Sequence, residues 1–177
     1  MNLWYGHPLT SVLLVDTPLP EGEWTNLQPY GGRGWCRMEQ RASAMVKDSA
    51  CLISLSALTG EEKSWGEVVN KGKGARLPPM PPAAFAAMLE EGVASGEIKF
   101  TNSGDVGLVC KIYERAFLTE MGSATELGYA FLKWDDAAGA ELCEALRYAH
   151  AHGGLTKLTA LWLFDNKLGD GFVTSFV

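Results

Sequence analysis

The chain has 177 residues, of which 47% are hydrophobic and 20% are charged, and its formal net charge at pH 7 is −6. This length and composition predict one globular unit with a sizeable core. The acidic balance and the lack of a clustered basic face argue against a nucleic-acid-binding surface. No apolar stretch has the length of a membrane span.

The four cysteines are widely spaced and form no CxxC pair. Because no histidine arrangement completes a zinc site with them, we predict reduced thiols and no metal centre. The first ten residues (MNLWYGHPLT) lack the charged start and long apolar run of a secretory signal. We therefore expect an intracellular protein, either cytoplasmic or organellar.

A strand, a loop, a helix and a second strand are predicted in the first third of the chain. Residues 11–15 (SVLLV) and 50–55 (ACLISL) are short apolar runs typical of buried strands. Between them, a glycine-rich loop ends at Gly34, and apolar residues then recur at helical spacing from Trp35 to Val46. This order predicts a βαβ unit with parallel strands.

A polar linker is predicted to follow, ending in the proline run LPPMPP. Within it, residues 71–76 (KGKGAR) lack the preceding strand and the Lys-Ser/Thr ending of a phosphate-binding loop, so we expect a solvated loop. An amphipathic helix should begin near Ala83, and a second helix should be capped by Asn102 or Ser103.

A third helix is predicted around residues 137–148, capped by the pair Asp135 and Asp136. His150 and His152 at its end point to different faces of the helix, which disfavours a metal site. The segment LTKLTALWLFDNKLGD then resembles a leucine-rich repeat of the ribonuclease-inhibitor type. The resemblance implies leucines that face a core and an asparagine, Asn166, that bridges the backbone of adjacent turns.

At most about two such repeats fit in the chain, although solenoids need roughly three or more units and a polar cap. Three outcomes remain open: the apolar C-terminus folds back as a cap, the natural protein is longer, or a partner covers the repeat edge. The last outcome makes the apolar side chains of this region candidate interaction residues: Leu161, Leu163, Leu168, Phe172 and Phe176.

The run from the first strand through Trp35, Cys36 and Glu39 to the second strand is similar to the second half of a Toll/interleukin-receptor-like (TIR-like) domain. In enzymatic members the equivalent glutamate binds the nicotinamide ribose and supports NAD cleavage, which makes Glu39 the candidate catalytic residue. Tyr30 and Trp35 are then candidates for stacking on a base. Alternatively, Trp35 and Cys36 pack the loop, and Glu39 complements the positive end of the helix.

Most of the chain also resembles a family of microalgal proteins with a Tyr-x-x-Arg-Gly-Trp-Cys-x-x-Glu signature. The matching parts here are Tyr30 to Glu39, PPMPPAAF, Phe100-Thr101-Asn102 and the C-terminal repeat segment. This resemblance implies a TIR-like module followed by repeats, an order that suggests recognition and signalling.

We therefore predict an α/β protein with a short parallel βαβ segment, packed helices and a rudimentary leucine-rich repeat at the C-terminus. The expected parts are a TIR-like segment (1–58), a Gly/Pro-rich linker (59–82), a helical segment (83–123) and an incomplete repeat segment (124–177). The first functional hypothesis is a noncatalytic interaction or scaffold protein without a cofactor. Its repeat edge would be covered by a protein partner or by a second copy of the chain. The alternative is a TIR-like protein that binds or cleaves NAD through Glu39.

Overall fold

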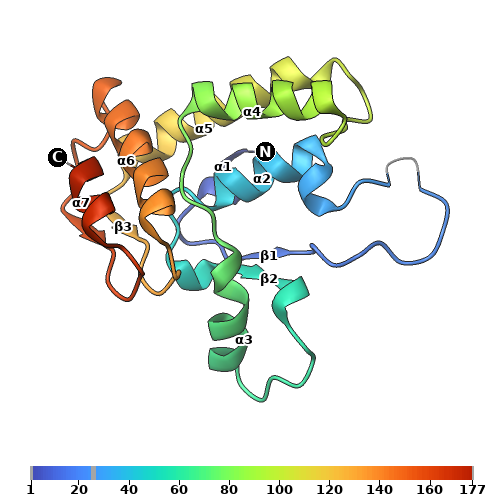
Figure 1. Ribbon diagram of the computed structural model, residues 1–177, viewed down its shortest axis with the longest axis horizontal. Helices are drawn as coiled ribbons and strands as arrows, with labels where there is room; N and C mark the ends of the chain where they lie inside the picture. Colours follow the sequence, from blue (N-terminus) through green and yellow to red (C-terminus); the bar gives the residue numbers. More distant parts are fainter. Residues whose placement is uncertain (1, 25–26, 177) are drawn as a thin grey trace.

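The computed structural model describes residues 2–24 and 27–176, so the part of the predicted loop at residues 25 and 26 lies outside it (Figure 1). Within these ranges, four short strands are interspersed among seven α-helices. In chain order the helices and strands are α1 (Asn2–Gly6), β1 (Val12–Leu14), α2 (Gly34–Ser43), β2 (Leu52–Ser54), α3 (Trp65–Gly72), α4 (Pro82–Ser95), α5 (Asp105–Ser123), β3 (Glu126–Gly128), α6 (Asp136–Ala151), β4 (Ala160–Trp162) and α7 (Asp170–Phe176).

The predicted βαβ unit is present at the N-terminal end of the chain. β1 pairs in parallel with β2, with Val12 opposite Leu52 and Leu14 opposite Ser54. All three residues of β2 are buried, as expected for a short apolar strand covered on both faces. Helix α2 connects the two strands and lies over them (Figure 1).

A second parallel pair forms near the C-terminus, where β3 pairs with β4 and α6 connects them. The predicted cap of α6 is confirmed, because Asp135 Oδ1 accepts a hydrogen bond from the Ala138 N–H at 3.1 Å. Asn166 also bridges neighbouring backbone segments as expected. Its Oδ1 accepts from the Leu132 and Trp134 N–H groups, both at 3.1 Å, and its Nδ2 donates to the Tyr129 carbonyl at 2.6 Å.

The two helices predicted in the middle of the chain are α4 and α5, which lie across α2 (Figure 1). α4 starts at Pro82, whose fixed φ suits a first helical position, and is capped after Ser95 by Gly96 in the left-handed conformation. The N-cap of α5 is Gly104, not Asn102 or Ser103; Asn102 instead accepts a hydrogen bond from the Gly104 N–H. The ring of Phe85 stacks on Tyr113, with centroids 3.8 Å apart.

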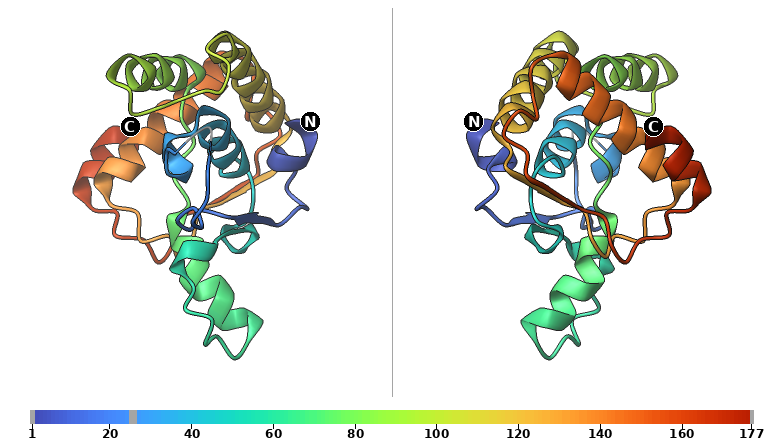
Figure 2. Two further views of the ribbon diagram at one scale, coloured as in Figure 1. Left: turned by 90° about the vertical axis from the view of Figure 1, so that its right-hand side faces the viewer. Right: turned by 90° about the vertical axis from the view of Figure 1, so that its left-hand side faces the viewer.

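The segment expected to be a linker contains helix α3, which is capped by Ser64. The helix projects from the end of the molecule opposite α4 and α5 (Figure 2). The expectation of a solvated loop at residues 71–76 is wrong. Residues 71 and 72 belong to α3, a 3₁₀ turn spans Lys73–Ala75, and Arg76 is only 2% exposed. Its guanidinium group is buried because backbone carbonyls of Ala44 and Gly128 accept its hydrogen bonds.

One hydrophobic core joins the N-terminal, helical and C-terminal parts of the chain. Its buried members include Met38 of α2, Phe85 of α4, Phe117 of α5, Leu127 of β3 and Leu142 of α6. The segments predicted at 1–58, 83–123 and 124–177 therefore pack as neighbours around shared side chains. No helix in the described ranges combines the length and apolar character needed to cross a membrane.

Candidate functional site

Glu39 lies in the second turn of α2, because the helix begins at Gly34. The electrostatic effect of a helix end fades within its first turn, so the expected role of Glu39 as a partner of the helix dipole is wrong. The side chain is instead half-buried. The residues around Glu39 explain its half-burial.

Two phenols and a thiol surround Glu39. Burial raises the pKa of Glu39, and a hydrogen bond with Tyr5 of α1 acts in the opposite direction. Burial also raises the pKa of Tyr30, and electrostatic interactions with Cys36 and Glu39 raise it further. The Cys36 pKa is raised by burial and then by Glu39, so this thiol is a weak nucleophile near neutral pH.

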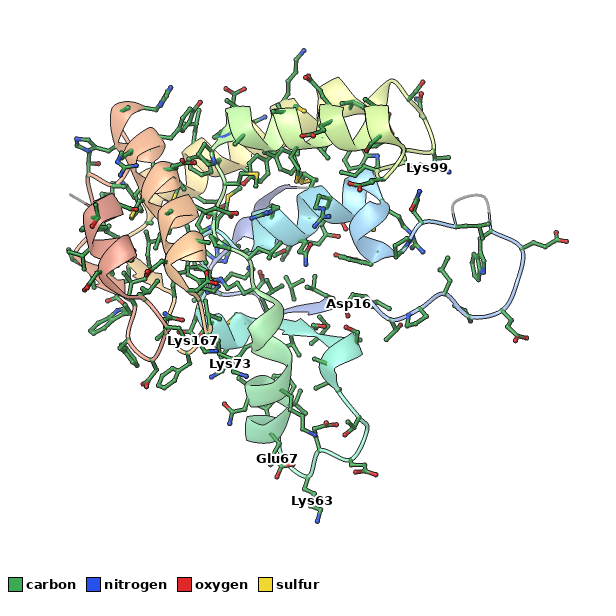
Figure 3. The ribbon with its side chains drawn as sticks, in the orientation of Figure 1. Asp16, Lys63, Glu67, Lys73, Lys99 and Lys167 are labelled. Atoms are coloured by element: carbon green, nitrogen blue, oxygen red, sulfur yellow. The ribbon has the colours of Figure 1, made fainter. Side chains whose placement is uncertain are left out.

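Asp16 follows β1 at the carboxyl end of the parallel pair, where Figure 3 labels it. It accepts a hydrogen bond from Ser54 Oγ at 2.6 Å and another from the Ser56 N–H at 2.9 Å. Burial acts to raise the pKa of Asp16, but these hydrogen bonds outweigh it and lower the pKa. An ionised carboxylate thus joins the ends of β1 and β2 near Tyr30, at the edge where open α/β sheets bind ligands.

A hollow of about 290 Å³ lies beside the start of α2, close to this edge. Trp35 lines the hollow, and its indole N–H donates to Asp105 Oδ2 at 2.9 Å, which fixes the ring. Tyr30 and Glu39 are not among its lining residues. The structure therefore brings Glu39 and Tyr30 together but places Trp35 in a neighbouring hollow, whose other described lining residues are Leu19, Trp24, Arg33, Gly34, Cys36, Lys99, Phe100 and Thr101.

The second candidate site is the outer side of the β3–β4 pair, where three aromatic rings are exposed. Phe131, Trp162 and Phe164 are 45%, 48% and 52% exposed, and we call them the aromatic face. Phe164 makes edge-to-face contacts with Phe131 and Trp162, with centroids 5.0 and 6.3 Å apart. The ammonium group of Lys73, labelled in Figure 3, lies 4.8 Å from the centre of the Phe131 ring.

The apolar residues predicted for interaction mostly lie elsewhere. Leu161, Leu163 and Leu168 are partly buried against the hydrophobic core. Phe172 packs over α6 at Gly139, where an added Cβ would lie 2.6 Å from the Phe172 ring, and Phe176 is 53% exposed on α7. Sequence reasoning missed Trp162 and Phe164, although the alternation in Leu161-Trp162-Leu163-Phe164 could have placed them on the opposite face.

The remaining motifs have structural roles. His152 stacks on Tyr148, with ring centroids 4.0 Å apart, at the end of α6. In the described part of the chain, no group of three or more His, Cys, Asp or Glu side chains is placed to hold a metal ion.

No family model, curated protein or solved structure matches this chain. The resemblances to TIR-like domains, leucine-rich repeats and the microalgal family therefore remain predictions. The function must be argued from the two sites described above.

Proposed function

We propose that this chain is a noncatalytic interaction protein, and that a protein partner binds the aromatic face. The observation that carries the proposal is the exposure of Phe131, Trp162 and Phe164 on one side of a strand pair. Aromatic side chains are enriched where proteins bind one another, because they bury a large area at little cost in side-chain entropy. Grouped exposed aromatic rings cost solubility when they serve no binding role.

The backbone of Phe131 supports the same conclusion. Its φ angle is +59°, in the left-handed region that costs an ordinary residue about 1–2 kcal/mol. Bulky residues in this conformation are uncommon and gather at binding and active sites. The fold holds Phe131 there with a hydrogen bond from its N–H to the Phe164 carbonyl at 3.1 Å, which places the two rings in contact.

We interpret β3, α6 and β4 as a short leucine-rich-repeat-type unit. The bridging amide of Asn166, and the packing of Leu161 in β4 and Leu163 just after it against the core, support this interpretation, since both features hold adjacent repeats together. Repeat proteins use the exposed positions of such strands as binding surfaces. Those positions here carry Trp162 and Phe164.

Selection of peptides from a phage-displayed random library on the purified chain tests the proposal. We expect selected peptides to bind the native chain and to lose at least about tenfold in affinity for the double variant Trp162→Ser/Phe164→Ser. Trp65→Ser is the matched control, because Trp65 is 62% exposed at the first residue of α3, the end of that helix away from Lys73. It should bind the peptides as the native chain does.

Two results would contradict this proposal. One is a set of selected peptides whose affinity is unchanged in the double variant while circular dichroism shows the native fold. The other is a concentration-dependent dimer in light scattering that the double variant abolishes, because the aromatic face would then be covered by a second copy of the chain.

A second candidate function is binding or cleavage of NAD or a related nucleotide as substrate. It is favoured by the gathering of Glu39, Tyr30 and Asp16 near the carboxyl edge of β1 and β2. In this hypothesis Glu39 would stabilise positive charge that develops on the ribose. A thermal-shift titration and a cleavage assay with NAD test it, using Glu39→Gln and the exposed Glu144→Gln as control. Equal melting temperatures with and without NAD, together with no turnover, would exclude it.

A further inference from the structure

A hollow of about 420 Å³ lies directly beside the aromatic face, with Trp162 in its wall. Three carboxylates line it, those of Asp48, Glu120 and Glu126, and no Lys, Arg or His is among its described lining residues. Gly128 of β3 also lines it, opposite Trp162 in the strand register. We call this the acidic hollow. It continues the surface on which the proposed partner would bind.

Glu120 is the unusual member of the acidic hollow. The residue is only 8% exposed, yet its carboxylate makes no hydrogen bond or salt bridge with the described residues. The carboxylate fills the space beside Gly6, where an added Cβ would lie 2.7 Å from Glu120 Oε1. A buried carboxylate is strongly stabilised by a charged hydrogen-bond donor, and none of the described residues supplies one here.

Two neighbouring cations, Lys47 and Arg76, donate their hydrogen bonds to other acceptors. His7 and Lys47 are near enough to act electrostatically on Glu120. The Lys47 ammonium group, however, donates its hydrogen bonds to the His7 carbonyl and to Thr10 Oγ1. Arg76, which acts electrostatically with Asp48, directs its donors to the carbonyls of Ala44 and Gly128. No Lys or Arg of the described residues therefore forms a salt bridge with the carboxylates that line the acidic hollow.

We propose, resting on the function proposed above, that the acidic hollow receives an arginine or lysine side chain of the partner bound to the aromatic face. The cationic head would donate to Glu120, the buried carboxylate of the hollow, which has no hydrogen-bond partner among the described residues. The indole of Trp162 would contact the same side chain through its ring face, as aromatic rings do with cations. The net charge of −6 also favours the approach of a positively charged partner.

The experiment compares two phage-displayed random peptide libraries that differ only in whether Lys and Arg are encoded. We expect peptides that depend on Trp162 to be selected only from the library with Lys and Arg. In the chain, Glu120→Gln should weaken them at least about tenfold, because a desolvated charged partner is left unpaired. Glu114→Gln is the matched control, since it removes an exposed carboxylate from the same helix.

The outcomes separate this inference from the proposed function. Selection of Trp162-dependent peptides equally from both libraries, with unchanged affinity in Glu120→Gln, would overturn the inference and leave the aromatic face as a binding surface. The absence of any Trp162-dependent peptide would overturn both. If Glu120→Gln melts at a lower temperature than the native chain, Glu126→Gln, at an exposed position, serves as a second variant. It should lower the affinity for the same peptides, and the loss of affinity should be smaller at high salt because salt screens exposed charges.

Discussion

Arg76 donates two hydrogen bonds to the carbonyl oxygen of Ala44, from Nε at 3.0 Å and from Nη2 at 2.8 Å. A third hydrogen bond runs from Nη1 to the Gly128 carbonyl at 2.8 Å. One side chain, from the segment between α3 and α4, thus joins the end of α2 to strand β3. Burial lowers the pKa of Arg76 to about 10, which leaves the group charged at neutral pH.

Replacing Arg76 should therefore destabilise the whole fold. We expect Arg76→Ala to lower the free energy of unfolding by about 3 kcal/mol, because it leaves buried carbonyl groups without donors. Arg76→Lys should not restore stability, since a single ammonium group cannot reproduce the planar fork of donors. Urea unfolding measures both effects. An Arg76→Ala variant as stable as the exposed-site control Arg115→Ala would contradict the assigned role.

Asn166 should protect two specific amides from hydrogen exchange. We expect Asn166→Ala to cost about 1–3 kcal/mol of stability and to speed exchange at the Leu132 and Trp134 N–H groups. Asn166→Asp keeps an acceptor for these two groups but loses the donation to the Tyr129 and Leu163 carbonyls. Its Leu132 and Trp134 amides should stay protected. Equal exchange at these two amides in both variants would be inconsistent with the bridging geometry.

The ionisation of Glu39 should destabilise the protein as the pH rises. Burial raises the folded-state pKa of Glu39 above its ordinary value, so the native state binds this proton more tightly than the unfolded state. The destabilisation is absent below the ordinary pKa and complete above the raised one. Glu39→Gln should gain stability relative to the native chain between acidic and neutral pH, as followed by chemical unfolding. If Glu39→Gln were instead less stable than the native chain at neutral pH, the negative charge of Glu39 would have a stabilising role.

Gly34 is required by the close approach of Phe100. A Cβ added at Gly34 would lie 1.9 Å from Phe100 Cζ, so Gly34→Ala should cost about 1–3 kcal/mol or more by overpacking. A Cβ added at Gly107 on α5 meets no atom within 4 Å, so Gly107→Ala should raise stability by up to about 1 kcal/mol. Thermal unfolding compares the two. Combining Gly34→Ala with Phe100→Ala should remove much of the penalty, and additive costs would show that the contact is not its cause.

The sequence alone determined the elements whose signals are local. The βαβ unit was predicted from the apolar runs at residues 11–15 and 50–55 and from the helical spacing after Gly34. Strand and helix periodicities depend on residues that are close together in the sequence. Asp135 was also identified correctly, since a helix cap joins neighbouring residues. Asn166 was identified from the repeat pattern, although its bonds to Tyr129, Leu132 and Trp134 join parts of the chain far apart in sequence. The tertiary structure alone decided which groups meet from distant segments. It buried Arg76 and left Trp162 and Phe164 exposed. It also placed Glu120 in the hollow that Trp162 lines, with no hydrogen-bond partner among the described residues. Burial and electrostatic pairing depend on contacts across the whole fold, which the order of residues does not reveal.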